Sequence, residues 1–217
     1  MRELELVIFD CDGVLVDSEV ISNSVLARAL TAEGLPTTLA QARRQYQGLL
    51  LSEVVQRAQQ DLGRTLTDDW VERFENDRAE AFHRELEPVP GAASAVRRVK
   101  DAGIPVCVAS QGSLAKTRMT LGLTGLRSLF SANALFSGQL VPRGKPYPDL
   151  FLHAAMTMGA KPSRCVVVED TVSGVTAAVA AGMRAIGYAA DSDETALRHA
   201  GAEILQILVE LPEILGI

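Results

Sequence analysis

The chain has 217 residues, of which 47% are hydrophobic and 22% charged, and its formal net charge is −6. This composition is typical of a globular protein, and the length suits one core or a core with a smaller inserted domain. The acidic balance and the lack of a basic run argue against a nucleic-acid partner. No apolar stretch reaches the ~20 residues that cross a bilayer, so no membrane association is expected.

The N-terminus and the cysteines bear on the cellular compartment. The opening MRELELVIFD carries two glutamates and no small-residue cleavage site, so we expect no signal peptide. Cys11, Cys107 and Cys165 lie in or beside apolar runs and form no CxxC pair. The sequence therefore predicts buried, reduced thiols in a cytoplasmic protein.

Short apolar runs that end at charged or small residues predict buried strands, and amphipathic stretches between them predict helices. This alternation predicts an α/β fold, a Rossmann-like three-layer core in which helices cover both faces of a parallel sheet. The predicted strands are 4–9, 106–110, 165–170 and 185–190, with a weaker candidate at 202–208; the predicted helices are 91–104, 113–123, 147–160 and 173–183.

One region interrupts the alternation. From about 18 to 86 the pattern is helical only, with apolar residues at helical spacing near both ends of the region. We therefore expect a catalytic core formed by 1–16 and 88–217, and a helical cap domain over 17–87 that is inserted after the first strand.

Two aspartates close the first predicted strand, in the stretch FDCDGVLVDSE. Side chains two apart on a strand point the same way, so Asp10 and Asp12 can face one spot. Two carboxylates about 4 Å apart repel by roughly 4 kcal/mol at an effective dielectric of 20. The pair therefore indicates a nearby cation.

Other polar side chains follow the later strands. Ser110 ends one strand, Glu169 and Asp170 end another, and Lys145 lies between them ahead of a proline. In an open parallel sheet, the carboxyl ends of the strands meet at one ligand-binding edge. Oxygen ligands of this kind suit Mg²⁺ shared with a phosphate, which Ser110, Lys145 and the main chain after Ser110 can also bind.

Each of these features alone has an ordinary structural explanation. An Asp-x-Asp pair is also typical of a turn and a helix N-cap, Ser110 and the Glu169–Asp170 pair are also typical of helix caps, and a lone lysine is usually solvated. Their order and spacing together favour a phosphoryl-transfer site.

The motifs FDCDGVLVDSE, VCVASQGS, GKPYPDLF and VVVEDTVSG resemble, in this order, the four motifs of the haloacid dehalogenase (HAD) superfamily. The helical insert resembles its α-helical cap, as in the branch of β-phosphoglucomutase and phosphoglycolate phosphatase. The resemblance implies that Asp10 is the nucleophile and Asp12 the general acid/base and a Mg²⁺ ligand through its carbonyl. It implies that Ser110 and Lys145 bind the phosphoryl group, and that Asp170 completes the Mg²⁺ site with Glu169 as a direct or indirect partner.

The expected activity is that of a Mg²⁺-dependent phosphatase acting on a small phosphorylated metabolite such as a sugar phosphate. A phosphomutase is the alternative. Ser22 stands where that mutase has a histidine, and QGLLLSE has no arginine for a second phosphate, although Arg43 or Arg44 remains a possible substitute. A signalling receiver domain and an inactive binding protein are the rivals from other classes; the cap and the intact motifs argue against them.

Substrate identity is expected to be read by the cap, with Arg44, Tyr46 and Gln47 as candidate contacts and Gln111 as a further one on the core. The rival interpretation is a solvated helix end followed by a turn. The family also implies a monomer.

Overall fold

The computed structural model describes residues 4–217; residues 1–3, with which the predicted core begins, lie outside the described residues. Its centre is a six-stranded sheet, in which every neighbouring pair is parallel. The strand order is β3-β2-β1-β4-β5-β6. The strands are β1 (Leu6–Phe9), β2 (Val106–Ser110), β3 (Leu135–Ser137), β4 (Cys165–Glu169), β5 (Arg184–Tyr188) and β6 (Glu203–Leu205).

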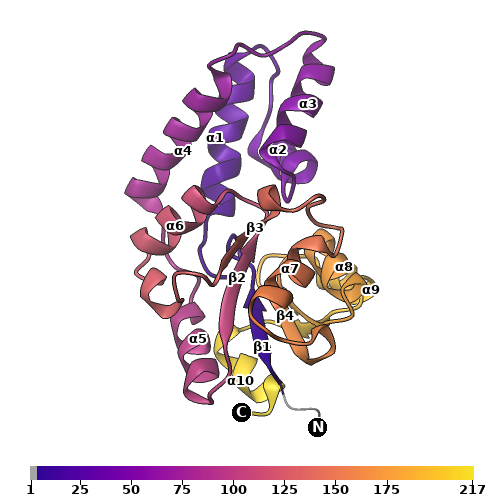
Figure 1. Ribbon diagram of the computed structural model, residues 1–217. Coiled ribbons are helices and arrows are strands. Elements are labelled where there is room, and N and C mark those ends of the chain that lie inside the picture. The colour runs from indigo at the N-terminus through magenta and orange to yellow at the C-terminus, as the bar shows by residue number, and fades with distance from the viewer. Residues whose placement is uncertain (1–3) are drawn as a thin grey trace.

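Helices cover both faces of this sheet because its strands are apolar on both faces. On β1, Val7 and Phe9 pack into one apolar cluster, with α5, α6 and α10, while Leu6 and Ile8 pack into the other, with α7, α8 and α9. Figure 1 shows these two helical layers on opposite sides of the strands. The helices are α5 (Ala92–Asp101), α6 (Leu114–Leu123), α7 (Asp149–Thr157), α8 (Val172–Ala180), α9 (Glu194–His199) and α10 (Leu211–Leu215).

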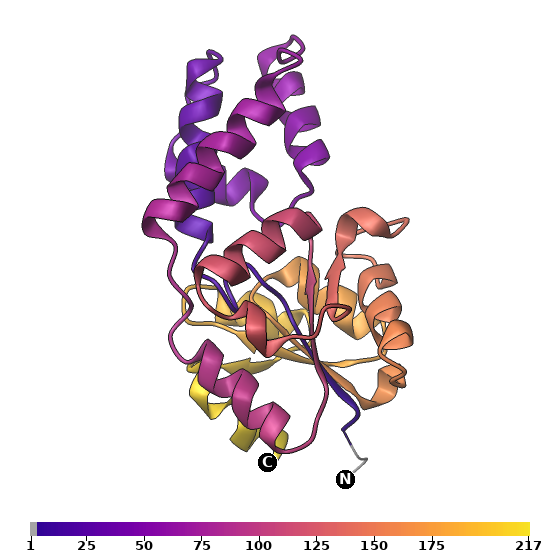
Figure 2. The ribbon, with the colours of Figure 1, turned by 60° about the vertical axis from the view of Figure 1, so that its left-hand side comes forward.

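Four further helices lie together beyond the carboxyl ends of the central strands, above the sheet in Figure 2. They are α1 (Glu19–Ala32), α2 (Leu39–Tyr46), α3 (Leu51–Leu62) and α4 (Trp70–Glu85). We call this group the cap. It has an apolar cluster of its own, in which the rings of Trp70 and Phe74 stack with centroids 5.4 Å apart.

The predicted α/β fold with a helical insert after the first strand is confirmed. The weak strand candidate at 202–208 is β6, but β3, α9 and α10 were not predicted. These elements have three to six residues, too few to show a clear period in the sequence. All three cysteines are buried and free, as expected. Within residues 4–217, no helix has the length and apolar character needed to cross a membrane.

Candidate active site

A cavity lies between the carboxyl ends of β1, β2 and β4 and the cap. The core contributes all six residues predicted from the motifs to its lining: Asp10, Asp12, Ser110, Lys145, Glu169 and Asp170. These six residues come together because of the topology of the sheet. Parallel strands that neighbour one another in the sheet end at the same edge, so residues that follow β1, β2 and β4 meet although they are far apart in sequence.

The turn after β1 depends on a glycine. Gly13 has φ +77°, a conformation that side-chain-bearing residues rarely adopt. A Cβ atom at this position would also lie 2.2 Å from Oδ2 of Asp170. Glycine therefore lets the loop with Asp12 pass directly against the carboxylate that follows β4.

Lys145 holds two of the carboxylates. Its ammonium donates to Asp10, to Oε1 of Glu169 at 2.6 Å and to the carbonyl of Ala109 at 3.1 Å. Burial disfavours the charged ammonium, but the two carboxylates outweigh it and raise the pKa of Lys145. The lysine is thus a fixed positive charge beside Asp10.

Both carboxylate oxygens of Glu169 already have hydrogen-bond partners. Besides the contact of Oε1 with Lys145, Oε2 accepts from the main-chain N–H and the hydroxyl of Thr171, each at 2.8 Å. Gly174 provides the space, since a Cβ there would lie 1.9 Å from the Glu169 carboxyl. The predicted direct contact of Glu169 with a metal would have to compete with these donors.

Gln111, predicted as a substrate contact, forms hydrogen bonds with the main chain of Lys145. Its Oε1 accepts from the Lys145 N–H at 3.0 Å, and its Nε2 donates to the Lys145 carbonyl at 3.5 Å. Its side chain lies against Gly138 and Gly144, where a Cβ would approach it to 2.7 Å and 2.5 Å. The residue lines the cavity, but its amide is directed into the Lys145 loop.

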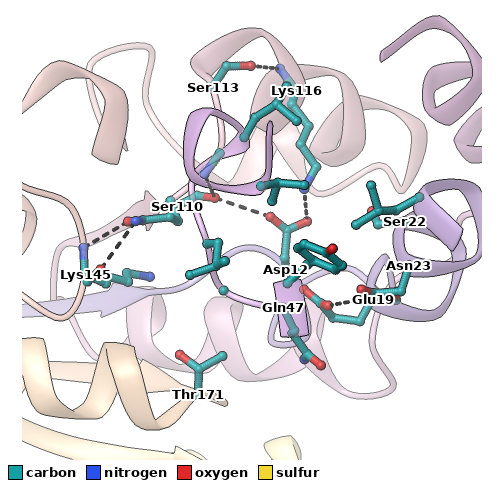
Figure 3. A pocket seen from close by; sticks show the side chains of 18 of the residues that line it. Asp12, Glu19, Ser22, Asn23, Gln47, Ser110, Ser113, Lys116, Lys145 and Thr171 are labelled. Carbon is teal, nitrogen blue, oxygen red and sulfur yellow. Dashed lines mark hydrogen bonds and ion pairs between the residues drawn. The ribbon is translucent and has the colours of Figure 1, made fainter. Parts of the chain in front are cut away.

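Asp12 is surrounded by donors (Figure 3). Oδ1 contacts the Lys116 ammonium at 2.7 Å and the hydroxyl of Ser18, and Oδ2 accepts from Ser110 at 3.4 Å. Burial by itself raises the pKa of the Asp12 carboxyl, but Lys116 and the hydrogen bonds bring it below its usual value. The sequence analysis missed Lys116; its place in the first turn of the helix that follows β2 was the available signal.

Asp10 and Asp170 form the part of the cavity that fits a cation. Burial and the neighbouring carboxylates outweigh the opposing charge of Lys145, so they raise the pKa of Asp10 to about 8 and that of Asp170 well above its usual value. Oδ1 of Asp170 is buried without a hydrogen-bond partner. A divalent ion would stabilise the ionised form of both carboxyl groups and would give Oδ1 of Asp170 a partner.

The available ligands suit Mg²⁺ in particular. Within residues 4–217, no three His, Cys, Asp or Glu side chains converge as a ready metal cluster. Mg²⁺ is commonly held by only one or two carboxylates and otherwise by water and substrate phosphate. Asp10 and Asp170, with the Asp12 carbonyl implied by the resemblance, fit that pattern.

The cap residues proposed from the sequence divide into two groups. Tyr46 and Gln47 line the cavity, but Arg44 is exposed and does not. The structure places its side chain outside the lining, because α2 buries Ala42 and Tyr46 on one face and Arg44 lies between them on the other. The arginine that does line the cavity is Arg78 on α4, which no motif indicated.

Comparison with known proteins identifies the family of the chain. The family model of the haloacid dehalogenase-like hydrolases matches residues 4–182. The chain belongs to this family. It is 31% identical to the 6-phosphogluconate phosphatase of Escherichia coli over 99% of this chain and 96% of that protein. It is 32% identical to hexitol phosphatase B of the same species, over 97% and 95%.

A solved structure shares both the core and the cap. The HAD family hydrolase of Deinococcus radiodurans with bound phosphate and sodium superposes with a TM-score of 0.79 at 30% identity, covering 100% of this chain and 96% of that one. The expectation of a HAD-type hydrolase with the α/β fold is thereby confirmed, and the roles of single residues are taken up below.

Proposed function

We propose that the chain is a Mg²⁺-dependent phosphatase that hydrolyses a small phosphorylated sugar or polyol through an aspartyl-phosphate. The observation that carries the proposal is the meeting of Asp10, Asp12, Ser110, Lys145 and Asp170 in one cavity closed by the cap. The relatives support the substrate class, since two of them are named for phosphatase activity on 6-phosphogluconate and on hexitol phosphates.

The core side chains supply the parts of a two-step displacement. A carboxylate oxygen of Asp10 attacks phosphorus, and the bond from phosphorus to the leaving-group oxygen breaks. Ser110 and Lys145 bind the phosphoryl oxygens while charge builds on them. When bound, Mg²⁺ supplies positive charge that screens the repulsion between the phosphate and the carboxylates.

Asp12 is placed to move the proton in both steps. As a carboxylic acid it gives its proton to the departing alkoxide; as a carboxylate it then takes a proton from water, which attacks phosphorus and releases Asp10. In the structure Lys116 holds Asp12 in the carboxylate form that the second step needs. The first step requires Lys116 to release Asp12, and we expect the leaving group to draw it away.

Hydrolysis is favoured over phosphomutase activity by the positions of the cap arginines. Arg44 is exposed, and Arg43 lines a neighbouring cavity that shares Glu19, Gln47 and Asp170 with the main one. Neither arginine lines the main cavity, where a mutase needs a cation for a second phosphate. Arg78, the cap cation that does line the main cavity, already pairs with Glu75.

The experiment is phosphate release from p-nitrophenyl phosphate and from a panel of sugar and polyol phosphates. Each is assayed with EDTA, with Mg²⁺ restored, and with the Asp10→Asn variant. We expect release that requires Mg²⁺ and is lost in Asp10→Asn, together with an acid-stable, hydroxylamine-labile phosphoryl label on the wild-type protein. Release that persists in Asp10→Asn would contradict the aspartate nucleophile, and conversion of a hexose 1-phosphate without release would restore the mutase.

A further inference from the structure

The cap side of the active-site cavity carries its own set of polar side chains, of which only Glu19 belongs to one of the four motifs. Glu19, Ser22 and Asn23 come from α1, and Glu75 and Arg78 come from α4. The two helices pack side by side over the strand ends (Figure 1). The set therefore faces the space that the leaving group of a substrate would occupy.

Arg78 and Glu75 form a fixed donor–acceptor pair. Nη2 of Arg78 contacts Oε1 of Glu75 at 3.3 Å, and the guanidinium lies 4.8 Å from the centre of the Phe74 ring. The Arg78 side chain is 14% exposed and Glu75 46% exposed, so the guanidinium is held and the carboxylate reaches the solvent side. A guanidinium has five N–H donors, and Glu75 is its hydrogen-bond partner among the described residues. The remaining donors can serve a ligand.

Ser22 gives an independent indication of a ligand. Its hydroxyl oxygen is buried and has no hydrogen-bond partner within the described part of the chain. A buried polar atom without a partner is costly, and a ligand hydroxyl would satisfy it. Nearby, Nδ2 of Asn23 donates to Oε2 of Glu19 at 3.0 Å, which makes a second donor–acceptor pair on the same wall (Figure 3).

The charges of the cavity discriminate between neutral and acidic leaving groups. Among residues 4–217, six carboxylates and three cations line it. Each cation already contacts a carboxylate: Lys145 contacts Asp10 and Glu169, Lys116 contacts Asp12, and Arg78 contacts Glu75. A second anionic group would have to compete with these carboxylates for the same cations, and the carboxylates nearby would repel it.

We propose that the cap wall formed by Glu19, Ser22, Asn23, Glu75 and Arg78 binds a neutral polyhydroxylated leaving group and rejects one that carries a carboxylate. Alternating donors and acceptors match the hydroxyls of a sugar or polyol, each of which both donates and accepts. Specificity for a neutral chain then comes from satisfied hydrogen bonds, and rejection of an acid comes from charge. The proposal rests on the phosphatase function above and specifies its substrate class.

The test uses two substrates that differ in one group. Glucitol 6-phosphate and 6-phosphogluconate have the same six-carbon chain and end in CH₂OH or in a carboxylate. We measure the ratio of their kcat/KM values, in which any general effect on the chemistry cancels. Wild-type protein should prefer glucitol 6-phosphate at least tenfold.

Variants of α4 separate charge from structure. Glu75→Gln keeps a hydrogen-bond acceptor but removes the negative charge. The ratio of kcat/KM for glucitol 6-phosphate to that for 6-phosphogluconate should therefore fall at least threefold. Asp77→Asn is the matched control, because it removes the same charge from an exposed residue of α4 that does not line the cavity, and its ratio should equal that of wild type. Arg78→Gln should raise KM for glucitol 6-phosphate at least fivefold.

A wild-type ratio near one or in favour of the acid would overturn the inference, and so would equal ratios in Glu75→Gln and Asp77→Asn. Hydrolysis of p-nitrophenyl phosphate with neither six-carbon substrate accepted would also overturn it, while leaving the phosphatase function in place. A lack of Mg²⁺-dependent release from all three compounds would instead reject the phosphatase function itself.

Discussion

Replacing Gln111 with alanine tests whether the Lys145 ammonium is positioned through its own main chain. The Gln111 amide both accepts from and donates to the Lys145 backbone, and it lies against two glycines. The variant removes these bonds and leaves room for the loop to move. Lys145 would then be free to shift relative to Asp10 and Glu169.

The expected size of the effect follows from the contacts. Leaving the Lys145 N–H without its acceptor should cost about 1–3 kcal/mol of folding stability. For a chain of this length, that lowers Tm by roughly 2–4 °C per kcal/mol. A catalytic group displaced by about 1 Å loses on the order of 100-fold in rate. We therefore expect a large fall in kcat beside a modest fall in Tm.

The assay compares kcat, KM and Tm with p-nitrophenyl phosphate and with a polyol phosphate. Because Lys145 acts on the phosphoryl group, kcat should fall by the same factor for both substrates. Gly144→Ala offers an independent route to the same displacement, since its Cβ would press on the Gln111 amide at 2.5 Å. Once Gln111 is alanine, the Gly144 substitution should cost little more, so the double variant should be non-additive.

Two results would refute this reasoning. One is a Gln111→Ala variant that keeps kcat within threefold of wild type. The other is a loss in the double variant equal to the product of the two single losses, which would mean that Gly144 acts independently of Gln111.

Three other substitutions probe the surroundings of the site. Gly174→Ala places a methyl group within 1.9 Å of the Glu169 carboxyl. The clash should destabilise the fold by about 2 kcal/mol, although alanine has the better helix propensity. An unchanged Tm would contradict the close contact between Gly174 and Glu169. Arg44→Ala should leave KM unchanged because the residue is exposed, whereas Gln47→Ala should raise KM because the residue lines the cavity. A KM that rises in Arg44→Ala and not in Gln47→Ala would support Arg44 as the substrate contact. Asp170→Asn should raise the Mg²⁺ concentration for half-maximal activity at least about tenfold, and an unchanged Mg²⁺ titration would place the ion elsewhere.

Local patterns were enough to predict the core. Apolar runs that end at charged residues predict the principal strands, and the rule that parallel strands end at one edge predicts that Asp10, Ser110 and Asp170 meet there with Lys145. The spacing of the two aspartates follows from strand alternation alone. These features depend on neighbours in sequence or on topology, which is why sequence reasoning reached them.

Contacts between elements were decided only by the tertiary structure. The sequence did not show that Arg78 lines the cavity and Arg44 does not, because which face of a cap helix meets the core depends on how the four cap helices pack together. It did not show that the Gln111 amide bonds to the main chain of Lys145, because the approach of Gly138 and Gly144 to that side chain joins distant segments. It likewise could not show that Lys116 pairs with Asp12 across 104 positions. The sequence by itself thus determined the chemistry of the strand ends, and the packing of the cap and loops around them decided which side chains can contact a substrate.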